Sequence, residues 1–156
     1  MRITRHDRLV HGLAALGRLR DKEVAVEPHI QTKAGLRKPD LIFKTHDKAI
    51  VMDCQIVSDV YDLNEEHAKK SRIYNYPEIR TEVAKLLKVD PNKITFTSCT
   101  FNWRGALATG CLSDIMNCGI LAKDLRKLSM RVVEGGFDSL MTYLHRTERT
   151  SGVVNS

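Results

Sequence analysis

The sequence has no long apolar run, and no stretch approaches the roughly 20 apolar residues that a membrane-spanning helix needs. Its first residues, MRITRHDRLVHG, are charged and lack the apolar centre of a secretory signal. It also contains no internal repeat and no low-complexity linker. We therefore expect an intracellular protein without a membrane span, folded around one core, which suits a chain of 156 residues.

Cysteine pairs and aromatic residues are also scarce. None of the four cysteines belongs to a CxxC pair, which argues against a zinc ribbon and favours reduced, buried thiols. No nucleophile triad is recognisable, which argues against acyl-transfer chemistry. The single tryptophan, Trp103, is expected to anchor the core, with stacking on an unpaired base as the alternative.

Apolar and basic residues are plentiful. Hydrophobic residues make up 42% of the chain, enough for a packed core. The formal net charge is +6, and the basic residues occur throughout the chain. This balance suits a polyanionic partner such as nucleic acid.

Residue patterns in the first third predict a helix followed by strands. Residues 4–20 have helical apolar spacing, with Thr4 as cap and Asp7 three positions later, as in a capping box. EVAVEPHI predicts a strand that Pro28 ends or confines to a sheet edge. QTKAGLRKP is expected to be a turn or loop, and LIFK and AIVMDCQIV predict two strands of a hairpin. The inner face of the helix is expected to comprise Leu9, Val10, Leu13, Leu16 and Gly17.

The remainder predicts helices around one further strand. A helix is expected over residues 63–75, capped by Asp62 or Asn64, and Pro77 opens another. ITFTSCTFNW predicts the last strand. Two or three helices are expected over residues 112–149, broken at Gly135–Gly136, before a frayed tail. The order α-β-β-β-α-α-β-α-α predicts an α/β fold with a mixed β-sheet flanked by helices.

Two aspartates are placed to meet at one end of the hairpin. Asp40 begins one strand and Asp53 lies within the next, so a short turn between them would bring both together. A carboxylate inside a buried strand is costly unless a metal or a cation compensates it. Two convergent carboxylates form an oxygen-rich site suited to Mg²⁺. The alternative is that Asp40 caps a turn after Pro39 and that Asp53 pairs with a basic residue.

A cation follows on the next helix. His67, Lys70 and Tyr74 are spaced i, i+3 and i+7, so they share one face, and Lys70 would point at the two aspartates. Mg²⁺ held by Asp40 and Asp53 would stabilise the charge that develops when a phosphodiester is hydrolysed. The alternative is a solvated basic helix with a half-buried packing tyrosine.

Three other side chains would assist at such a centre. Lys70 would add a positive charge at the phosphate or orient the attacking water, and Tyr74 would hydrogen-bond the phosphate or the water. Gln55 points to the same side of its strand as Asp53, so its amide would orient the water or the metal shell.

Several strings carry a resemblance to a known family. RHD, EPHIQT, GLRKPDL, VMDCQIVSD, HAKKSRIY and TSCTFNWRG occur in this order. Together they resemble the restriction-like endonuclease domain of site-specific non-LTR retrotransposons, which insert into large-subunit ribosomal RNA genes. The resemblance runs from about Arg5 to Ile120. It implies one domain over residues 1–156, with a nuclease core at 1–120, C-terminal helices at 121–150 and a frayed tail at 151–156.

The resemblance implies a PD-(D/E)XK restriction-endonuclease-like core whose catalytic set falls on Asp40, Asp53, Lys70 and Tyr74. In the wider superfamily the lysine usually lies two residues after the second acid. Gln55 holds that position here, so the resemblance implies that the lysine has moved to the helix. The superfamily often adds an acid from its first helix, for which the candidates are Asp7 and Glu27.

The family's activity implies the rest of the prediction. Its domain uses Mg²⁺, for which Mn²⁺ is expected to substitute, to nick double-stranded target DNA. The freed 3′-OH primes reverse transcription. The implied partners are ribosomal DNA and the reverse transcriptase and DNA-reading zinc fingers of the same polyprotein, with no membrane. The implied location is nuclear.

Basic residues around the acids are predicted to hold DNA phosphates. Arg37 and Lys38 directly precede the acidic site, and Lys69 and Arg72 flank the helix face. Arg104 is expected to reach the DNA backbone or to lock a turn. The residues predicted to contact DNA are Arg5, His6, Arg37, Lys38, His67, Lys69, Arg72 and Arg104.

Two other functions are open at this point. The chain could be a nucleic-acid binding module with weak or no cleavage in isolation. It could also be a structure-selective nuclease similar to Holliday-junction resolvases, which share the core fold. The NWRG string and the displaced lysine favour the retrotransposon-type endonuclease over the resolvase.

Overall fold

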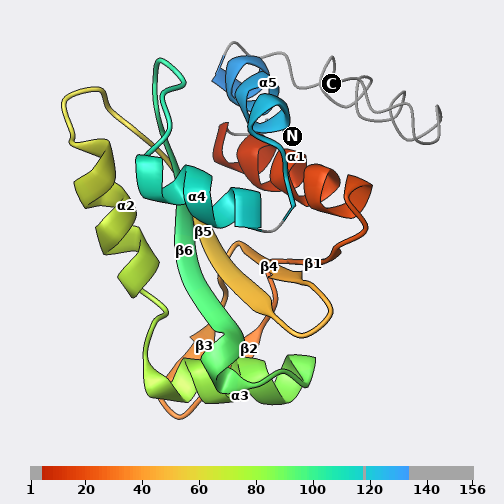
Figure 1. Ribbon diagram of the computed structural model, residues 1–156. Coiled ribbons are helices and arrows are strands. Elements are labelled where there is room, and N and C mark those ends of the chain that lie inside the picture. The colour runs from red at the N-terminus through yellow and green to blue at the C-terminus, as the bar shows by residue number, and fades with distance from the viewer. Residues whose placement is uncertain (1–4, 118, 134–156) are drawn as a thin grey trace.

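The computed structural model describes residues 5–117 and 119–133. They form a mixed four-stranded sheet between two layers of helices, which confirms the predicted α/β class (Figure 1). The sheet order is β1-β4-β5-β6, with β5 and β6 parallel and the other pairs antiparallel. Its strands are β1 (Glu23–Val26), β4 (Leu41–Lys44), β5 (Ala49–Val57) and β6 (Ile94–Asn102).

One face of the sheet is covered by α1 (Arg5–Leu19), α4 (Thr109–Asn117) and α5 (Ala122–Val133). All five residues predicted for the inner face of α1 are buried. Alternate residues of β5 join them, because successive side chains of a strand point to opposite faces. These β5 residues are Ile50, Met52 and Cys54.

The opposite face is covered by α3 (Pro77–Leu87) and α2 (Leu63–Arg72). Ala49 and Val51 pack against the buried side of α3. The next residues on that side of β5 are Asp53 and Gln55. The same alternation that builds the core therefore carries a carboxylate and an amide toward α2.

The segment predicted as a turn or loop after Pro28 contains a turn flanked by two short strands that were not predicted. Its strands are β2 (Ile30–Thr32) and β3 (Gly35–Arg37). Ile30 and Thr32 are buried. Gly35 has a φ of 112°, a backbone conformation that glycine adopts without steric cost and other residues rarely adopt. The prediction missed these strands because three-residue strands of mixed polarity give no clear alternation, and packing against α3 selects this structure.

Several boundaries differ from those expected. α2 is capped by Asp62, whose side chain accepts a hydrogen bond from the Glu65 N–H, while Asn64 accepts one from the Thr109 N–H. α2 ends at Arg72, and α4 begins three residues before Leu112. A 3₁₀ turn, η1 (Pro91–Lys93), precedes β6. The Thr4 cap, Cys118, Gly135–Gly136 and the tail at 151–156 lie outside the described residues.

The turn after β6 corrects the prediction for Trp103, which is 56% exposed rather than a core anchor. Asn102 is the last buried residue of the strand, and its side-chain oxygen accepts hydrogen bonds from the N–H groups of Arg104 and Ala106. The chain therefore turns away from the sheet directly after Asn102. Gly105, with a φ of 86°, completes the turn.

No helix within residues 5–117 and 119–133 combines the length and the apolar character that crossing a membrane requires.

Candidate active site

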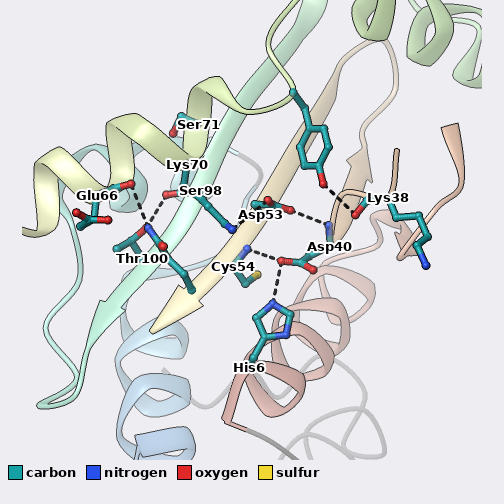
Figure 2. A network of polar contacts seen from close by, with 12 residues as sticks. His6, Lys38, Asp40, Asp53, Cys54, Glu66, Lys70, Ser71, Ser98 and Thr100 are labelled. Atoms are coloured by element: carbon teal, nitrogen blue, oxygen red, sulfur yellow. Dashed lines mark hydrogen bonds and ion pairs between the residues drawn. The ribbon is translucent and has the colours of Figure 1, made fainter. Parts of the chain in front are cut away.

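The two aspartates meet across β4 and β5. Leu41 pairs with Met52, so Asp40, just before β4, lies opposite Asp53. The Asp40 N–H donates to Asp53 Oδ1 at 3.1 Å, and the Cys54 N–H donates to Asp40 Oδ2 at 2.7 Å (Figure 2). Backbone groups of the two neighbouring strands thus hold both carboxylates at one point.

The environments of the two carboxylates differ in their effect on pKa. Burial, followed by the charge of Asp40, raises the pKa of Asp53 above its ordinary value, against hydrogen bonding from the Asp40 N–H and the charge of Lys70. Burial also acts to raise the pKa of Asp40. Hydrogen bonds from His6 and from the Cys54 N–H outweigh it and leave the pKa of Asp40 below its ordinary value. The nearby charge of Asp40 and the burial of Asp53 thus oppose ionisation of Asp53, while hydrogen bonds favour ionisation of Asp40.

His6 approaches Asp40 from the first turn of α1. Its Nε2 atom lies 3.0 Å from Asp40 Oδ2, and this hydrogen bond is the largest cause that raises the pKa of His6. Asp7, the predicted additional acid, lies 3.7 Å from the other ring nitrogen of His6. His6 therefore contacts Asp40 directly, and Asp7 contacts the opposite side of the His6 ring.

Lys70 approaches from the opposite side, on α2. Its Nζ atom lies 3.6 Å from Asp53 Oδ2, and its side chain is 30% exposed (Figure 2). The structure thus brings Asp40, Asp53 and Lys70 together, the arrangement that the residue spacing predicts. A buried carboxylate, a neighbouring carboxylate and an ammonium group share one site.

A polar network fixes α2 on the sheet. His67 Nδ1 lies 2.6 Å from Ser98 Oγ on β6, and burial lowers the pKa of His67. Ser98 in turn lies 2.7 Å from Thr100 Oγ1. His67 thus contacts the sheet through Nδ1 from the helix that carries Lys70, and its contact with DNA stays a prediction.

Gln55 belongs to the same network. Its amide donates to the Glu66 carbonyl at 3.0 Å and to Thr100 Oγ1 at 3.1 Å. The amide nitrogen of Gln55 therefore helps to hold α2, and its role in orienting water or metal stays a prediction. Sequence reasoning missed Ser98 and Thr100, although their period-two spacing in the last strand places both on the Asp53 side of the sheet.

Tyr74 lies just beyond α2 and faces Lys38, which precedes Asp40 in the chain. Its hydroxyl donates to the Lys38 carbonyl at 3.2 Å. Burial, followed by the charges of Asp53 and Asp40, raises the pKa of Tyr74 to about 12. The phenol therefore stays protonated at neutral pH and acts as a hydrogen-bond donor. Arg37, predicted to hold phosphate, donates to the Tyr76 hydroxyl at 3.2 Å.

Of the remaining predicted residues, Arg5 lines a hollow beside the acids. Arg5, Lys38, Lys69 and Arg72 are exposed. Arg104 contacts Asp59 at 3.0 Å and so ties the turn after β6 to the loop after β5. Glu27 is exposed, and its N–H donates to the Asp40 carbonyl at 2.8 Å.

An open hollow of about 530 Å³ adjoins the acids. Arg5, His6, Gln55, Lys70 and Trp103 contribute to its walls. Its basic groups make it suitable for an anionic ligand, and its openness to solvent suits a ligand larger than the hollow itself.

The donor set at the acids fits Mg²⁺. The described part of the chain holds no group of three or more histidine, cysteine or acidic side chains arranged for a metal. Mg²⁺ commonly uses only one or two protein carboxylates and keeps several waters or substrate oxygens as ligands. Asp40 and Asp53 supply those two hard carboxylates.

Sequence comparison relates this chain to retrotransposon polyproteins. The chain is 31% identical over 145 residues to the Pol polyprotein of the type-2 retrotransposable element R2DM of Drosophila melanogaster, covering 92% of this chain and 14% of that protein. It is 29% identical over 151 residues to the R2 Pol polyprotein of Nasonia vitripennis, covering 96% and 14%. The R2 Pol polyprotein of Bradysia coprophila is 26% identical over 151 residues, covering 92% and 17%.

R2 retrotransposon Pol polyproteins are thus homologues of this chain, which spans about one seventh of the length of the first two. No protein-family model matches the chain. A crystal structure of a protein of unknown function aligns with a TM-score of 0.35 and 10% identity, over 82% of this chain and 99% of that one.

Proposed function

We propose that this chain is a Mg²⁺-dependent DNA endonuclease domain with a PD-(D/E)XK restriction-endonuclease-like core. The observation that carries the proposal is the meeting of Asp40 and Asp53 across β4 and β5, with the Lys70 ammonium 3.6 Å from Asp53. Similarity to R2 Pol polyproteins supports a role in retrotransposition. The reaction is the nicking of target DNA, which leaves a 3′-OH to prime reverse transcription.

Asp40 and Asp53 would hold the metal ion, with Mn²⁺ able to replace Mg²⁺. When bound, the ion supplies a Lewis acid that neutralises charge on the scissile phosphate. Lys70 places a further positive charge beside Asp53, where it stabilises the additional negative charge of the transition state. Tyr74 contributes a neutral hydroxyl group beside Lys38, two residues before the proposed metal ligand Asp40.

Double-stranded target DNA, ribosomal DNA above all, is the proposed substrate, and the nucleus is the proposed location. The reverse transcriptase and DNA-reading modules would belong to the same polyprotein, in keeping with the length of the homologues. Exposed Lys38, Lys69 and Arg72 would hold the phosphates on either side of the cleavage point.

Plasmid nicking tests the proposal. Wild type, Asp40→Asn and Asp53→Asn are incubated with supercoiled DNA in Mg²⁺, in Mn²⁺ and in EDTA. Asp47→Asn is the matched control, because Asp47 is an exposed carboxylate on the turn of the same hairpin. Wild type and the control are expected to nick only with metal, and both site variants should lose at least about a hundredfold in rate.

The product identifies the bond that breaks. A DNA polymerase should extend the nicked strand without prior treatment, because the proposed reaction leaves a 3′-OH. Equal nicking by wild type and Asp53→Asn would overturn the proposal. Metal-independent DNA binding without nicking would favour a binding module, and preferential cutting of four-way junctions would favour a resolvase-like enzyme.

A further inference from the structure

Trp103 is the only tryptophan of the chain, and the fold leaves its indole in solvent. Single apolar side chains are common on protein surfaces, so exposure alone assigns no role to this indole. Its position on the wall of the hollow beside the two aspartates is what distinguishes it. Neither the proposed metal site nor the hydrophobic core uses this side chain.

The turn that carries Trp103 is held from several sides. Asn102 braces it from within, through hydrogen bonds at 3.0 and 2.9 Å to the N–H groups of Arg104 and Ala106. Ser129 on α5 donates to the Gly105 carbonyl at 2.6 Å. Arg104 is tied to Asp59 on the neighbouring loop at 3.0 Å. Trp103 is therefore presented by a fixed backbone, which lowers the entropy lost when a ligand binds it.

Trp103 also stands in a charged setting. It lines the hollow of about 530 Å³ together with Arg5, His6 and Lys70. His6 and Lys70 in turn contact the two aspartates of the proposed catalytic site. A flat apolar ring beside cations matches one nucleotide, whose base stacks on an aromatic face while its phosphate meets basic groups.

We propose that Trp103 is a stacking platform for an unpaired base of the DNA strand beside the scissile phosphate. A base within a duplex is covered on both faces by its neighbours, so the indole can stack only on a base that has left the helix. The inference rests on the proposed function and adds to it a preference for locally unpaired DNA. It concerns substrate binding, and no chemical step depends on it.

The fluorescence of this single tryptophan provides a direct test. The 156-residue chain is titrated in EDTA with a fully paired duplex and with the same duplex containing three unpaired nucleotides. Stacking is expected to quench indole emission on the second DNA and to leave it nearly unchanged on the first. Equal emission changes on both DNAs would overturn the proposal.

Affinities of variants give a second readout, measured by anisotropy of labelled DNA. Trp103→Leu keeps an apolar side chain without a flat face, and it should weaken binding of the unpaired DNA by about 5- to 140-fold, the contribution of one stacked base. Trp103→Phe should recover most of that loss. Both should bind the paired duplex within about twofold of wild type. Unchanged binding of the unpaired DNA by Trp103→Leu would refute the proposal.

The matched control is Tyr61→Leu. Tyr61 is equally exposed, at 56%, and lies on the loop after β5 without lining the hollow, so its replacement should leave both affinities unchanged. A loss in Tyr61→Leu equal to that in Trp103→Leu would also refute a specific platform at Trp103. Because both readouts are taken without metal, they do not depend on cleavage. Absent nicking with intact quenching would overturn only the nuclease assignment.

Discussion

Replacing Lys70 by methionine tests whether its ammonium group balances the buried charge of Asp53. The two charged atoms are 3.6 Å apart, which at an effective dielectric constant of about 20 corresponds to an attraction of about 4–5 kcal/mol. The cost of removing both groups from water opposes this attraction, and partial exposure of Lys70 screens it. A net loss of about 2 kcal/mol remains for Lys70→Met, whose side chain keeps a similar length and flexibility.

Urea unfolding followed by circular dichroism, at neutral pH in EDTA, measures this loss. A decrease of about 2 kcal/mol corresponds to a Tm lower by roughly 4–8 °C for a domain of this size. Asp53→Asn removes the charge that Lys70 balances, so the double variant should lose at least about 1 kcal/mol less than the sum of the single changes. Additivity within about 0.5 kcal/mol would refute a direct interaction between the two side chains.

Three further predictions concern the scaffold. Burial lowers the pKa of His67, so the folded protein favours the neutral ring. The neutral ring therefore contributes stability above about pH 6.5, the ordinary pKa of histidine. This contribution is lost as the pH falls through the lower pKa of the folded state. Thermal unfolding of His67→Gln should therefore depend less on pH below about 6.5 than that of wild type. A Cβ atom at Gly17 would lie 2.5 Å from Phe43 Cε1. The overpacking in Gly17→Ala should cost about 1–3 kcal/mol and exceed the gain of about 1 kcal/mol in helix propensity. Denaturant unfolding should therefore show Gly17→Ala to be less stable than wild type. Asp124, 3% exposed, pairs with Arg20, and Asp124→Asn should cost about 3 kcal/mol in the same assay, whereas Asp47→Asn, at an exposed pair, should cause no measurable change.

The sequence predicts best those features that depend on local pattern. Alternation in AIVMDCQIV identifies the central strand, and the short turn before it makes Asp40 and Asp53 neighbours. The helical spacing of His67, Lys70 and Tyr74 puts them on one side of the helix. Once that helix covers the sheet face that carries Asp53, Lys70 points toward Asp53. These elements are predictable because strand and helix periods relate neighbouring residues directly to faces.

The features that sequence reasoning missed depend on contacts between distant segments. Gln55 and His67 have side chains suited to a catalytic site, but partners on β6 and α2 engage them in fastening the helix. Trp103 resembles a core residue by type, and only the bracing of the turn by Asn102 shows that it is turned outward. Such outcomes are set by three-dimensional packing, which overrides the preference of a single residue.

The way α2 is attached to the sheet affects how Lys70 is held against Asp40 and Asp53. None of the residues of α2 is buried, and polar contacts from Gln55 and His67 connect it to the sheet. Water competes with such contacts far better than with apolar packing, so α2 should open locally at a lower free energy than β5 or β6. Lys70 can then withdraw while Asp40 and Asp53 keep their places, and amide hydrogen exchange would register the helix and the strands as separate units.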